Sequence, residues 1–179
     1  MAPRTALAAR LAGDRAGTAA VEFALLTPLF ATLFFGTFEL ANLLLADMKL
    51  SATAQAAADL VAPRALGSLS HADIADLSAA AAQVMAPLPA GAQLKLAYAG
   101  VTYSGGAPAI VWHDETNGAA AITLATIPGG VDLAALGGSA IGATDSLVIV
   151  RVDYAYASPV SYVLARSWSL SDAAFERQN

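Results

Sequence analysis

Glu22 is an acidic side chain at the start of a long apolar stretch of this chain. A carboxylate inside a bilayer costs about 3 kcal/mol on insertion scales, and somewhat less near the interface, so a simple anchor has little reason to carry one. An amine on a neighbouring helix could pair with this carboxylate, offset that cost and set the register between two chains. The alternative is a side chain that extends back to the nearby polar surface. From the residues alone, Glu22 is therefore a candidate either for pairing between two chains or for a side chain that extends to the polar surface.

Residues suited to catalysis or metal binding are few. The chain has 2 histidines and no cysteine, which excludes a thiolate metal site, a cysteine nucleophile and a disulfide. His71 lies at the start of a predicted helix, where a solvated side chain is expected. His113-Asp114-Glu115 could bind a hard cation, but the Thr-Asn-Gly that follows is typical of a turn and favours a polar loop. With no phosphate-binding loop or nucleophile elbow, we predict no enzyme activity, no catalytic residue, no cofactor and no metal.

The charge distribution argues against one class of partner and predicts an orientation. The net charge is −5, and no basic patch could displace the counterions of a phosphate backbone, so a nucleic-acid partner is disfavoured. Three of the 9 basic residues, Arg4, Arg10 and Arg15, precede the apolar stretch. Because positive charge marks the cytoplasmic end of membrane helices, this head is predicted to stay in the cytoplasm.

The apolar stretch is long enough to cross a bilayer. No charge occurs from Phe23 to Phe38, and flanking apolar residues extend the predicted span to about 20–46. A cleaved secretory signal is the competing interpretation. It fits poorly, because the apolar run is too long and the first small-x-small site, Ala52-Thr53-Ala54, would make an oversized leader. We therefore predict a single-pass membrane protein in which residues 1–17 form a basic cytoplasmic leader.

The membrane helix is predicted to continue out of the bilayer, so that the whole helix covers residues 18–62. The segment after the span is rich in alanine and lacks glycine and proline until Pro63, which ends the helix together with Gly67. Its small residues suit close approach by another helix or by the sheet of the chain's own domain, although alanine is also simply a good helix former. Within the span, Pro28 removes a backbone hydrogen bond and predicts a weakened or kinked helix.

Residues 63–179 are predicted to form one α+β domain outside the membrane. Ser70 and Asp73 resemble a capping box, and apolar residues at helical spacing predict a second, amphipathic helix over about 71–86. Alternation of apolar and polar residues predicts a small antiparallel β-sheet that packs against the helices. Its strands are expected at Leu94–Thr102, Ala109–Asp114 and Leu147–Tyr156. In the last of these strands, Val150 and Val152 should point inward.

Three further segments of this domain have weaker patterns. Residues 119–127 are a candidate short strand, and the glycine-rich residues 129–145 are predicted to form a long surface loop. Residues 168–175 fit either a last strand or a short helix capped by Ser171.

The junction between the basic head and the apolar helix carries a more specific signal. Its residues, Arg15-Ala16-Gly17-Thr18-Ala19-Ala20-Val21-Glu22-Phe23, together with the LLTPLFATLFFGTFELANLLL that follows, resemble the N-terminal domain of TadE-like proteins. These are minor pseudopilins of the tight-adherence (Tad, or Flp) branch of type IV pilus systems. The resemblance covers about residues 14–60. The tail from Val152 is also similar, but Glu176-Arg177-Gln178-Asn179 differs from the usual arginine-proline-arginine ending.

The resemblance implies processing followed by assembly. A membrane-embedded aspartyl prepilin peptidase would cut after Gly17 on the cytoplasmic side, so that Thr18 becomes the new N-terminus and Glu22 its fifth residue. Glu22 would then pair with the Thr18 amine of a neighbouring subunit. Local unwinding at Pro28 would help the subunit to move from the bilayer into a filament.

The same resemblance implies a function, a location and a set of partners. The function is that of a minor pilin-like subunit or assembly factor of a Tad/Flp pilus, involved in pilus biogenesis and surface adhesion. The chain would lie in the bacterial inner membrane with its C-terminal domain in the periplasm, or outside the cell within a pilus. Its partners would be that membrane, the peptidase, other pilins and the assembly platform. The alternative is a single-pass, membrane-tethered periplasmic binding or adhesion module, which would retain residues 1–17.

Overall fold

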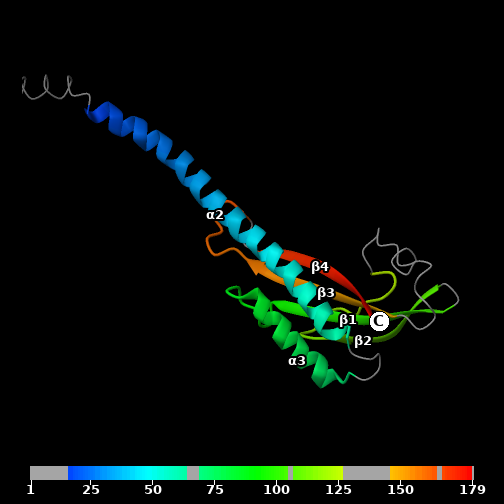
Figure 1. Cartoon of the computed structure of the whole chain (residues 1–179). Helices are drawn as coiled ribbons and strands as arrows, with labels where there is room; N and C mark the ends of the chain where they lie inside the picture. The colour runs from blue at the N-terminus through cyan, green and yellow to red at the C-terminus, as the bar shows by residue number, and fades with distance from the viewer. Residues whose placement is uncertain (1–15, 64–68, 105–106, 127–145, 165–166, 179) are drawn as a thin grey trace, which may run out of the picture.

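Among the residues that the structure describes, the first element is a long helix, α2, Ala16–Val61. The computed structural model describes residues 16–63, 69–104, 107–126, 146–164 and 167–178. The 46 residues of α2 correspond to a rod of about 69 Å at about 1.5 Å per residue. Its N-terminal part projects away from the rest of the structure, whereas its C-terminal part lies across a β-sheet (Figure 1). The predicted long helix is thus confirmed over the described residues from Ala16 onward.

Pro28 lies inside α2, and the helix continues across it. Hydroxyl groups on either side donate to carbonyl oxygens of the preceding turn: Thr27 Oγ1 to Phe23 at 2.7 Å, and Thr32 Oγ1 to Pro28 at 2.8 Å. These hydroxyls bond carbonyls beside the proline, whereas the carbonyl that loses its helix donor at Pro28 is that of Ala24, four residues earlier. The kink or weakening at Pro28 stays a prediction.

The second helix, α3, covers His71–Ala82 and is followed by a short 3-10 helix, η1, Gln83–Met85. The predicted capping box is present. The Ser70 side chain accepts a hydrogen bond from the backbone N–H of Asp73, and the Asp73 carboxylate accepts one from the backbone N–H of Ser70 at 2.9 Å. Two backbone donors that have no partner within a helix are therefore satisfied reciprocally. The predicted helix over 71–86 is confirmed, with its last turn in the 3-10 form.

In the described part of the chain, four strands form one antiparallel sheet in the order β2-β1-β3-β4. Their bounds are Leu94–Ser104 for β1, Ala107–Glu115 for β2, Ser146–Ala157 for β3 and Ser167–Gln178 for β4. β1 and β2 are adjacent, with a register shift between Gly100 and Val101. β4 pairs with the whole of β3. The three predicted strands are confirmed, and the alternative left open for residues 168–175 is decided in favour of a strand.

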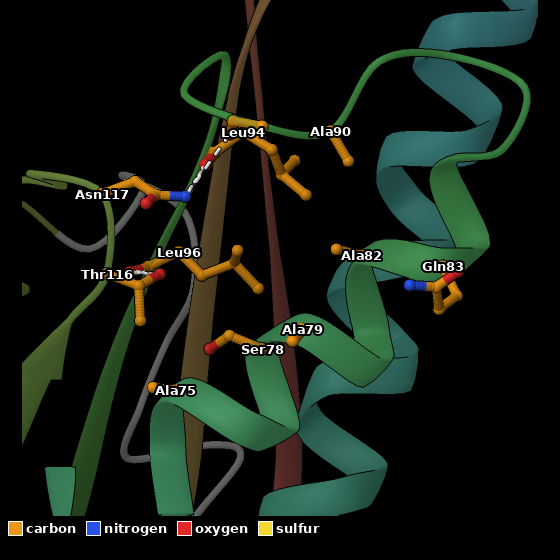
Figure 2. A pocket seen from close by; sticks show the side chains of 11 residues that line it. Ala75, Ser78, Ala79, Ala82, Gln83, Ala90, Leu94, Leu96, Thr116 and Asn117 are labelled. Carbon is orange, nitrogen blue, oxygen red and sulfur yellow. Dashed lines mark hydrogen bonds between the residues drawn. The ribbon is translucent and has the colours of Figure 1, made fainter. Parts of the chain in front are cut away.

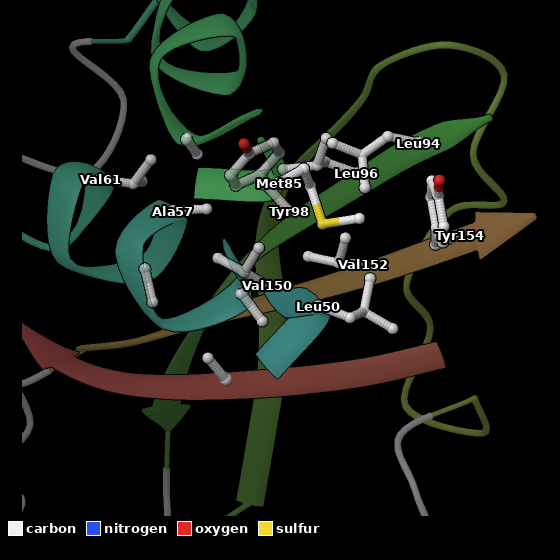
Figure 3. Packing of buried hydrophobic residues seen from close by; sticks show 14 of the residues in the cluster. Leu50, Ala57, Val61, Met85, Leu94, Leu96, Tyr98, Val150, Val152 and Tyr154 are labelled. Carbon is white, nitrogen blue, oxygen red and sulfur yellow. The ribbon is translucent and has the colours of Figure 1, made fainter. Parts of the chain in front are cut away.

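One face of the sheet holds the main core (Figure 3). Val150 and Val152 of β3 are fully buried there, as their alternation with polar residues predicted. Both helices cover this face, because Leu50 of α2 and Ile74 of α3 belong to the same buried cluster. The α+β class, with a long N-terminal helix, a second helix and an antiparallel sheet, is therefore confirmed.

The opposite face of the sheet holds a smaller core. Leu147 and Ile149 pack there against small residues of β1, and Ile122 joins the cluster as a buried side chain. The strand predicted over 119–127 is wrong for its described part, residues 119–126, which run as irregular chain and a turn. The Thr126 backbone N–H donates to the carbonyl of Thr123 at 2.9 Å, and this turn competes with strand pairing while Ile122 covers the sheet. The rest of that segment and the glycine-rich residues 129–145 lie outside the described residues.

Candidate functional site

The pair predicted for cleavage, Gly17 and Thr18, lies in the first turn of α2. A Cβ atom added at Gly17 would meet no heavy atom of the described residues within 4 Å, so packing does not require a glycine here. A glycine costs a helix about 1 kcal/mol relative to alanine because its backbone has more freedom to lose. The first turn can therefore open more readily at Gly17 than at the alanines beside it. Cleavage between these two residues stays a prediction.

Glu22 is exposed on α2, one helical turn after Thr18. It makes no hydrogen bond or ion pair with the residues that the structure describes, and its chain neighbours Val21 and Phe23 are also exposed. A carboxylate on an apolar helix surface is costly to bring into lipid unless a partner is supplied. In this structure the chain's own domain does not supply that partner, so Glu22 is available to another molecule.

The apolar residues of 17–38, here called the exposed half of α2, are largely open to the surroundings. Large side chains point outward along its length, including Leu25, Leu33 and Phe34. The helix from Gly17 to Val61 is long and apolar enough to cross a membrane, and the most apolar part of it is not buried in the fold. A surface of this size and composition is typical of contact with lipid or with other apolar helices. The chain therefore carries a single-pass candidate membrane anchor near its N-terminus.

The remaining residues of α2, 39–61, are here called the packed half because one side of this segment is buried against β3 and β4. Ala54, Ala57 and Ala58 are among its buried residues, whereas Ala52 is exposed. Small side chains let the helix axis come close to the sheet. Close approach by another helix or by the sheet was predicted for these small residues, and in the fold α2 packs against both α3 and the sheet of its own domain.

Glu39, at the boundary between the two halves, has a fully buried carboxylate. Its Oε2 atom accepts hydrogen bonds from the backbone N–H groups of Val163 at 3.0 Å and Leu164 at 2.6 Å, and Oε1 accepts one from the N–H of Tyr162. Three successive backbone donors thus converge on one carboxylate, an arrangement known as a nest. Hydrogen bonds to an ionised acceptor are among the stronger ones. Glu39 therefore fixes the segment 158–164, here called the clamp loop, to α2.

The clamp loop is itself shaped to present these donors. The Ser158 Oγ atom accepts a hydrogen bond from the Ser161 N–H at 3.2 Å, and Ser161 Oγ donates to the Ser158 carbonyl at 3.1 Å. Ser161 has φ +52°, in the left-handed region that a serine adopts only where its surroundings hold it there. The loop connects β3 to β4 and lies beside α2 where the helix leaves the domain (Figure 1).

Sequence reasoning missed Glu39, although a signal was present. Glu39 interrupts an apolar run, between Phe38 and Leu40, and a charge in such a position needs a partner for the same reason as Glu22. The partner could not be found from the pattern, because the donors are backbone groups more than 120 residues later in the chain and carry no sequence signature.

The two histidines lie apart from this helix surface. His71 Nδ1 is 2.6 Å from Asp114 Oδ1, so the expected solvated residue is exposed but bonded across to β2. His113 Nδ1 is 2.8 Å from Glu115 Oε1. The segment 113–115 is the end of β2 rather than a loop, and alternation along the strand puts Asp114 on the opposite face from its neighbours. No cluster of three or more ligand-type side chains that could hold a metal occurs among the residues that the structure describes.

A pocket of about 380 Å³ lies between α3 and β1 (Figure 2). Its wall on the helix side consists mainly of alanines, and Leu94 and Leu96 line the strand side. Asn117 lies at one end, where its side chain donates to the Leu94 carbonyl at 2.8 Å. None of the side chains that line this pocket is titratable, so it presents no group for general acid or base chemistry.

Comparison with known families identifies one segment of the chain. Residues 17–59 match the model of the family described as TadE-like protein. No curated protein and no solved structure matches the chain significantly. The matched residues begin at Gly17 and cover both the exposed half of α2 and most of its packed half. The resemblance seen in the sequence is confirmed for this segment.

Proposed function

Because α2 is a TadE-like helix, we propose that this chain is a minor pilin-like subunit or assembly factor of a Tad/Flp pilus. The observation that carries the proposal is the position of the family match, which begins at Gly17 and follows α2 to within its last turn. The role is structural, in pilus biogenesis and surface adhesion, and needs no catalytic residue or cofactor in this chain. The exposed half of α2 anchors it in the bacterial inner membrane.

The proposed orientation puts the N-terminus in the cytoplasm and the sheet domain in the periplasm, or outside the cell once the subunit enters a pilus. It is supported by Arg4, Arg10 and Arg15, which precede the apolar helix. A reporter that is active only in the periplasm should be active when fused after Asn179. Activity of a cytoplasm-dependent reporter at the same site would overturn the orientation.

Processing is the next step of the proposal: a prepilin peptidase cuts between Gly17 and Thr18. Two observations support this site. Gly17 has open space around it, and it weakens the first turn of α2, which must become extended in a protease cleft. Cleavage gives Thr18 a new α-amine, which has a reference pKa near 8 and is mostly cationic at neutral pH.

Assembly then depends on Glu22. Its carboxylate is exposed on the apolar half of α2, and within the described residues it has no partner. Pairing with the Thr18 amine of a neighbouring pilin would offset the cost of carrying a charge in the bilayer and fix the register between subunits. The proposed partners are therefore other pilins and the Tad/Flp assembly platform, in addition to the inner membrane and the peptidase.

Two substitutions separate processing from assembly. Gly17→Val should block maturation, because its branched side chain adds bulk beside the scissile bond, where a cleft that accepts glycine has no room for it. Gly17→Ala is the matched control that adds a Cβ without branching. Because the space at Gly17 is open, neither change should disturb the fold. Glu22→Gln should mature and insert, yet fail to assemble for want of a charged partner for the Thr18 amine.

N-terminal sequencing of the membrane-extracted chain, with and without the peptidase, measures processing. Immunoblots of membrane and sheared-surface fractions should show precursor for Gly17→Val and mature, unassembled subunit for Glu22→Gln. If both variants mature and support normal surface piliation, the pilin-like mechanism is wrong. A wild-type chain that keeps residues 1–17 in the presence of the peptidase would point instead to the membrane-tethered binding or adhesion module.

A further inference from the structure

The clamp loop, residues 158–164, exposes apolar side chains where most loops expose polar ones. Tyr162 is 56% exposed, Val163 is 48% exposed and Val160 is also exposed. The Glu39 carboxylate holds the backbone of Tyr162 and Val163, so these two side chains start from a fixed backbone. An apolar surface that is held rigidly in the open is typical of a contact with another apolar phase.

This loop surface is continuous with the exposed half of α2. The rings of Tyr162 and Phe35 have centroids 5.3 Å apart, and a Cβ atom at Gly36 would lie 3.5 Å from a methyl group of Val163. Phe34 and Phe38 are exposed on the same turns of the helix. We call this combined surface, formed by Phe34, Phe38, Val160, Tyr162 and Val163, the apolar collar. The apolar collar connects the exposed half of α2 to the domain, and none of its five residues is charged.

The collar lies at the depth expected for the outer edge of a bilayer. The stretch from Thr18 to Phe38 is about 31 Å long at about 1.5 Å per residue, and the hydrocarbon core of a bilayer is about 30 Å thick. The first charged residue after Glu22 is Glu39, whose carboxylate faces backbone donors and is shielded from the surroundings. The end of the hydrocarbon core therefore coincides with the collar.

We propose that the clamp loop is a membrane-docking surface that inserts its apolar side chains into the headgroup and acyl-chain boundary of the bilayer that α2 crosses. Tyr162 suits this position, because tyrosine places an apolar ring in the acyl boundary and a hydroxyl among headgroups. Trp168, which is exposed at the start of β4, adds a second aromatic side chain just after the loop. Docking sets the angle and height of the sheet domain above the membrane.

The proposal moves the outer end of the membrane span from about residue 46 to Phe38, since Ala46 is buried in the domain core. Glu39 acts as a positioning residue for the loop. Membrane docking of the clamp loop requires only that α2 spans a membrane, and it is independent of cleavage at Gly17 and of pairing by Glu22.

Spin labels on the full-length chain test the docking. Because the sequence has no cysteine, Val163→Cys and Val111→Cys each provide one labelling site. Val111 is a matched control, a valine of similar exposure, 53%, on β2 at the far edge of the sheet. In vesicles of phosphatidylglycerol and phosphatidylcholine, the label at 163 should collide several-fold less with a water-soluble nickel chelate, and more with oxygen, than the label at 111. Equal nickel accessibility at both sites would overturn the proposal.

Three further arms test the occupant of the collar, the role of Glu39 and the contribution of the Tyr162 ring. Protection of the label at 163 should persist when the protein is diluted with excess lipid, whereas protection only at high protein density would mean that another subunit covers the collar, and the proposal would fail. Glu39→Gln removes the charged acceptor and should raise nickel accessibility at 163 but leave 111 unchanged. If the label at 163 stays protected in Glu39→Gln, Glu39 does not position the loop.

Tyr162→Ser, which keeps the backbone donors, should reduce protection of the label at 163 without altering the circular dichroism of the domain.

Discussion

The two halves of α2 belong to one uninterrupted helix but lie in different surroundings. The exposed half carries large apolar side chains such as Leu25, which is 73% exposed, whereas in the packed half Leu50 is fully buried between the helix and the sheet. Charge already separates them: the exposed half carries only Glu22, whereas the packed half also needs polar surroundings for Asp47, Lys49 and Asp59. The buried side of the packed half adds a second difference, because its small alanines let the helix approach the sheet, while large residues give the exposed half an apolar surface.

The two glutamates of α2 show the same division. Glu39 is buried and accepts three backbone hydrogen bonds, while Glu22 is exposed and is not bonded within the described structure. A carboxylate in apolar surroundings needs compensation in either place. The fold provides that compensation for Glu39, and an intermolecular partner is proposed for Glu22. The exposed and unbonded Glu22 is therefore the observation that supports the proposed intermolecular partner.

The largest effect is expected where charge is placed under the packed half. Val150 is fully buried on the sheet face that α2 covers, so Val150→Asp should destabilise the domain by about 4 kcal/mol or more, because an unpaired carboxylate would be buried. Val111→Asp is the matched control on the exposed side of β2, with an expected cost of about 1 kcal/mol or less. Thermal unfolding of the full chain in detergent, followed by near-UV circular dichroism, measures both. Equal melting temperatures for Val150→Asp and wild type would contradict the assigned face.

A pair of leucine truncations compares the two halves directly. Leu50→Ala should cost about 3 kcal/mol, because it leaves a cavity between α2 and the sheet. Leu25→Ala removes the same atoms from the exposed half and should change domain stability by no more than about 0.5 kcal/mol. The same unfolding measurement applies to both variants. A loss of similar size for Leu25→Ala would show that the exposed half also packs on the chain's own domain.

The elements that the sequence predicted well are those with a local cause. The capping box of Ser70 and Asp73 marks the start of α3, and alternation along β3 assigns Val150 and Val152 to the core face. Residues within a few positions of each other suffice to make these patterns. The same holds for the family resemblance, which rests on a continuous segment of α2.

The elements that the sequence did not predict depend on distant partners. Residues 168–175 were compatible with strand or helix, and pairing with the whole of β3 decides the matter. The segment around Ile122 has strand-like composition, yet it folds over the second face of the sheet as irregular chain. The Glu39 carboxylate is bonded to backbone N–H groups that lie more than 120 residues later in the chain. Contacts between residues far apart in the sequence determine these features, so local propensity could not predict them.

A smaller effect than that of Leu50→Ala is expected for a polar contact on the covered face, between α3 and β1. The Ser78 and Tyr98 hydroxyl oxygens are 2.7 Å apart, and Ser78 Oγ also donates to the Ile74 carbonyl at 2.7 Å. Because Ser78 has one hydroxyl proton, Tyr98 is the donor in their shared bond. Tyr98→Phe should therefore cost only about 1 kcal/mol at neutral pH, far less than the loss of apolar packing in Leu50→Ala.

The pH dependence of this variant tests the same contact in a second way. Burial raises the pKa of Tyr98 to about 12, above the value of about 10 expected for an unfolded tyrosine. The folded state therefore retains a proton that the unfolded state loses, so the stability from this group is full below pH 10 and declines as the pH rises from 10 towards 12. Tyr98→Phe should flatten that decline without abolishing it, because burial also raises the pKa values of Tyr154 and Tyr156. Unfolding free energies of wild type and variant at pH 8 and about pH 11 would measure the difference. An unchanged alkaline slope would mean that Tyr98 is solvated and that α3 does not close over β1.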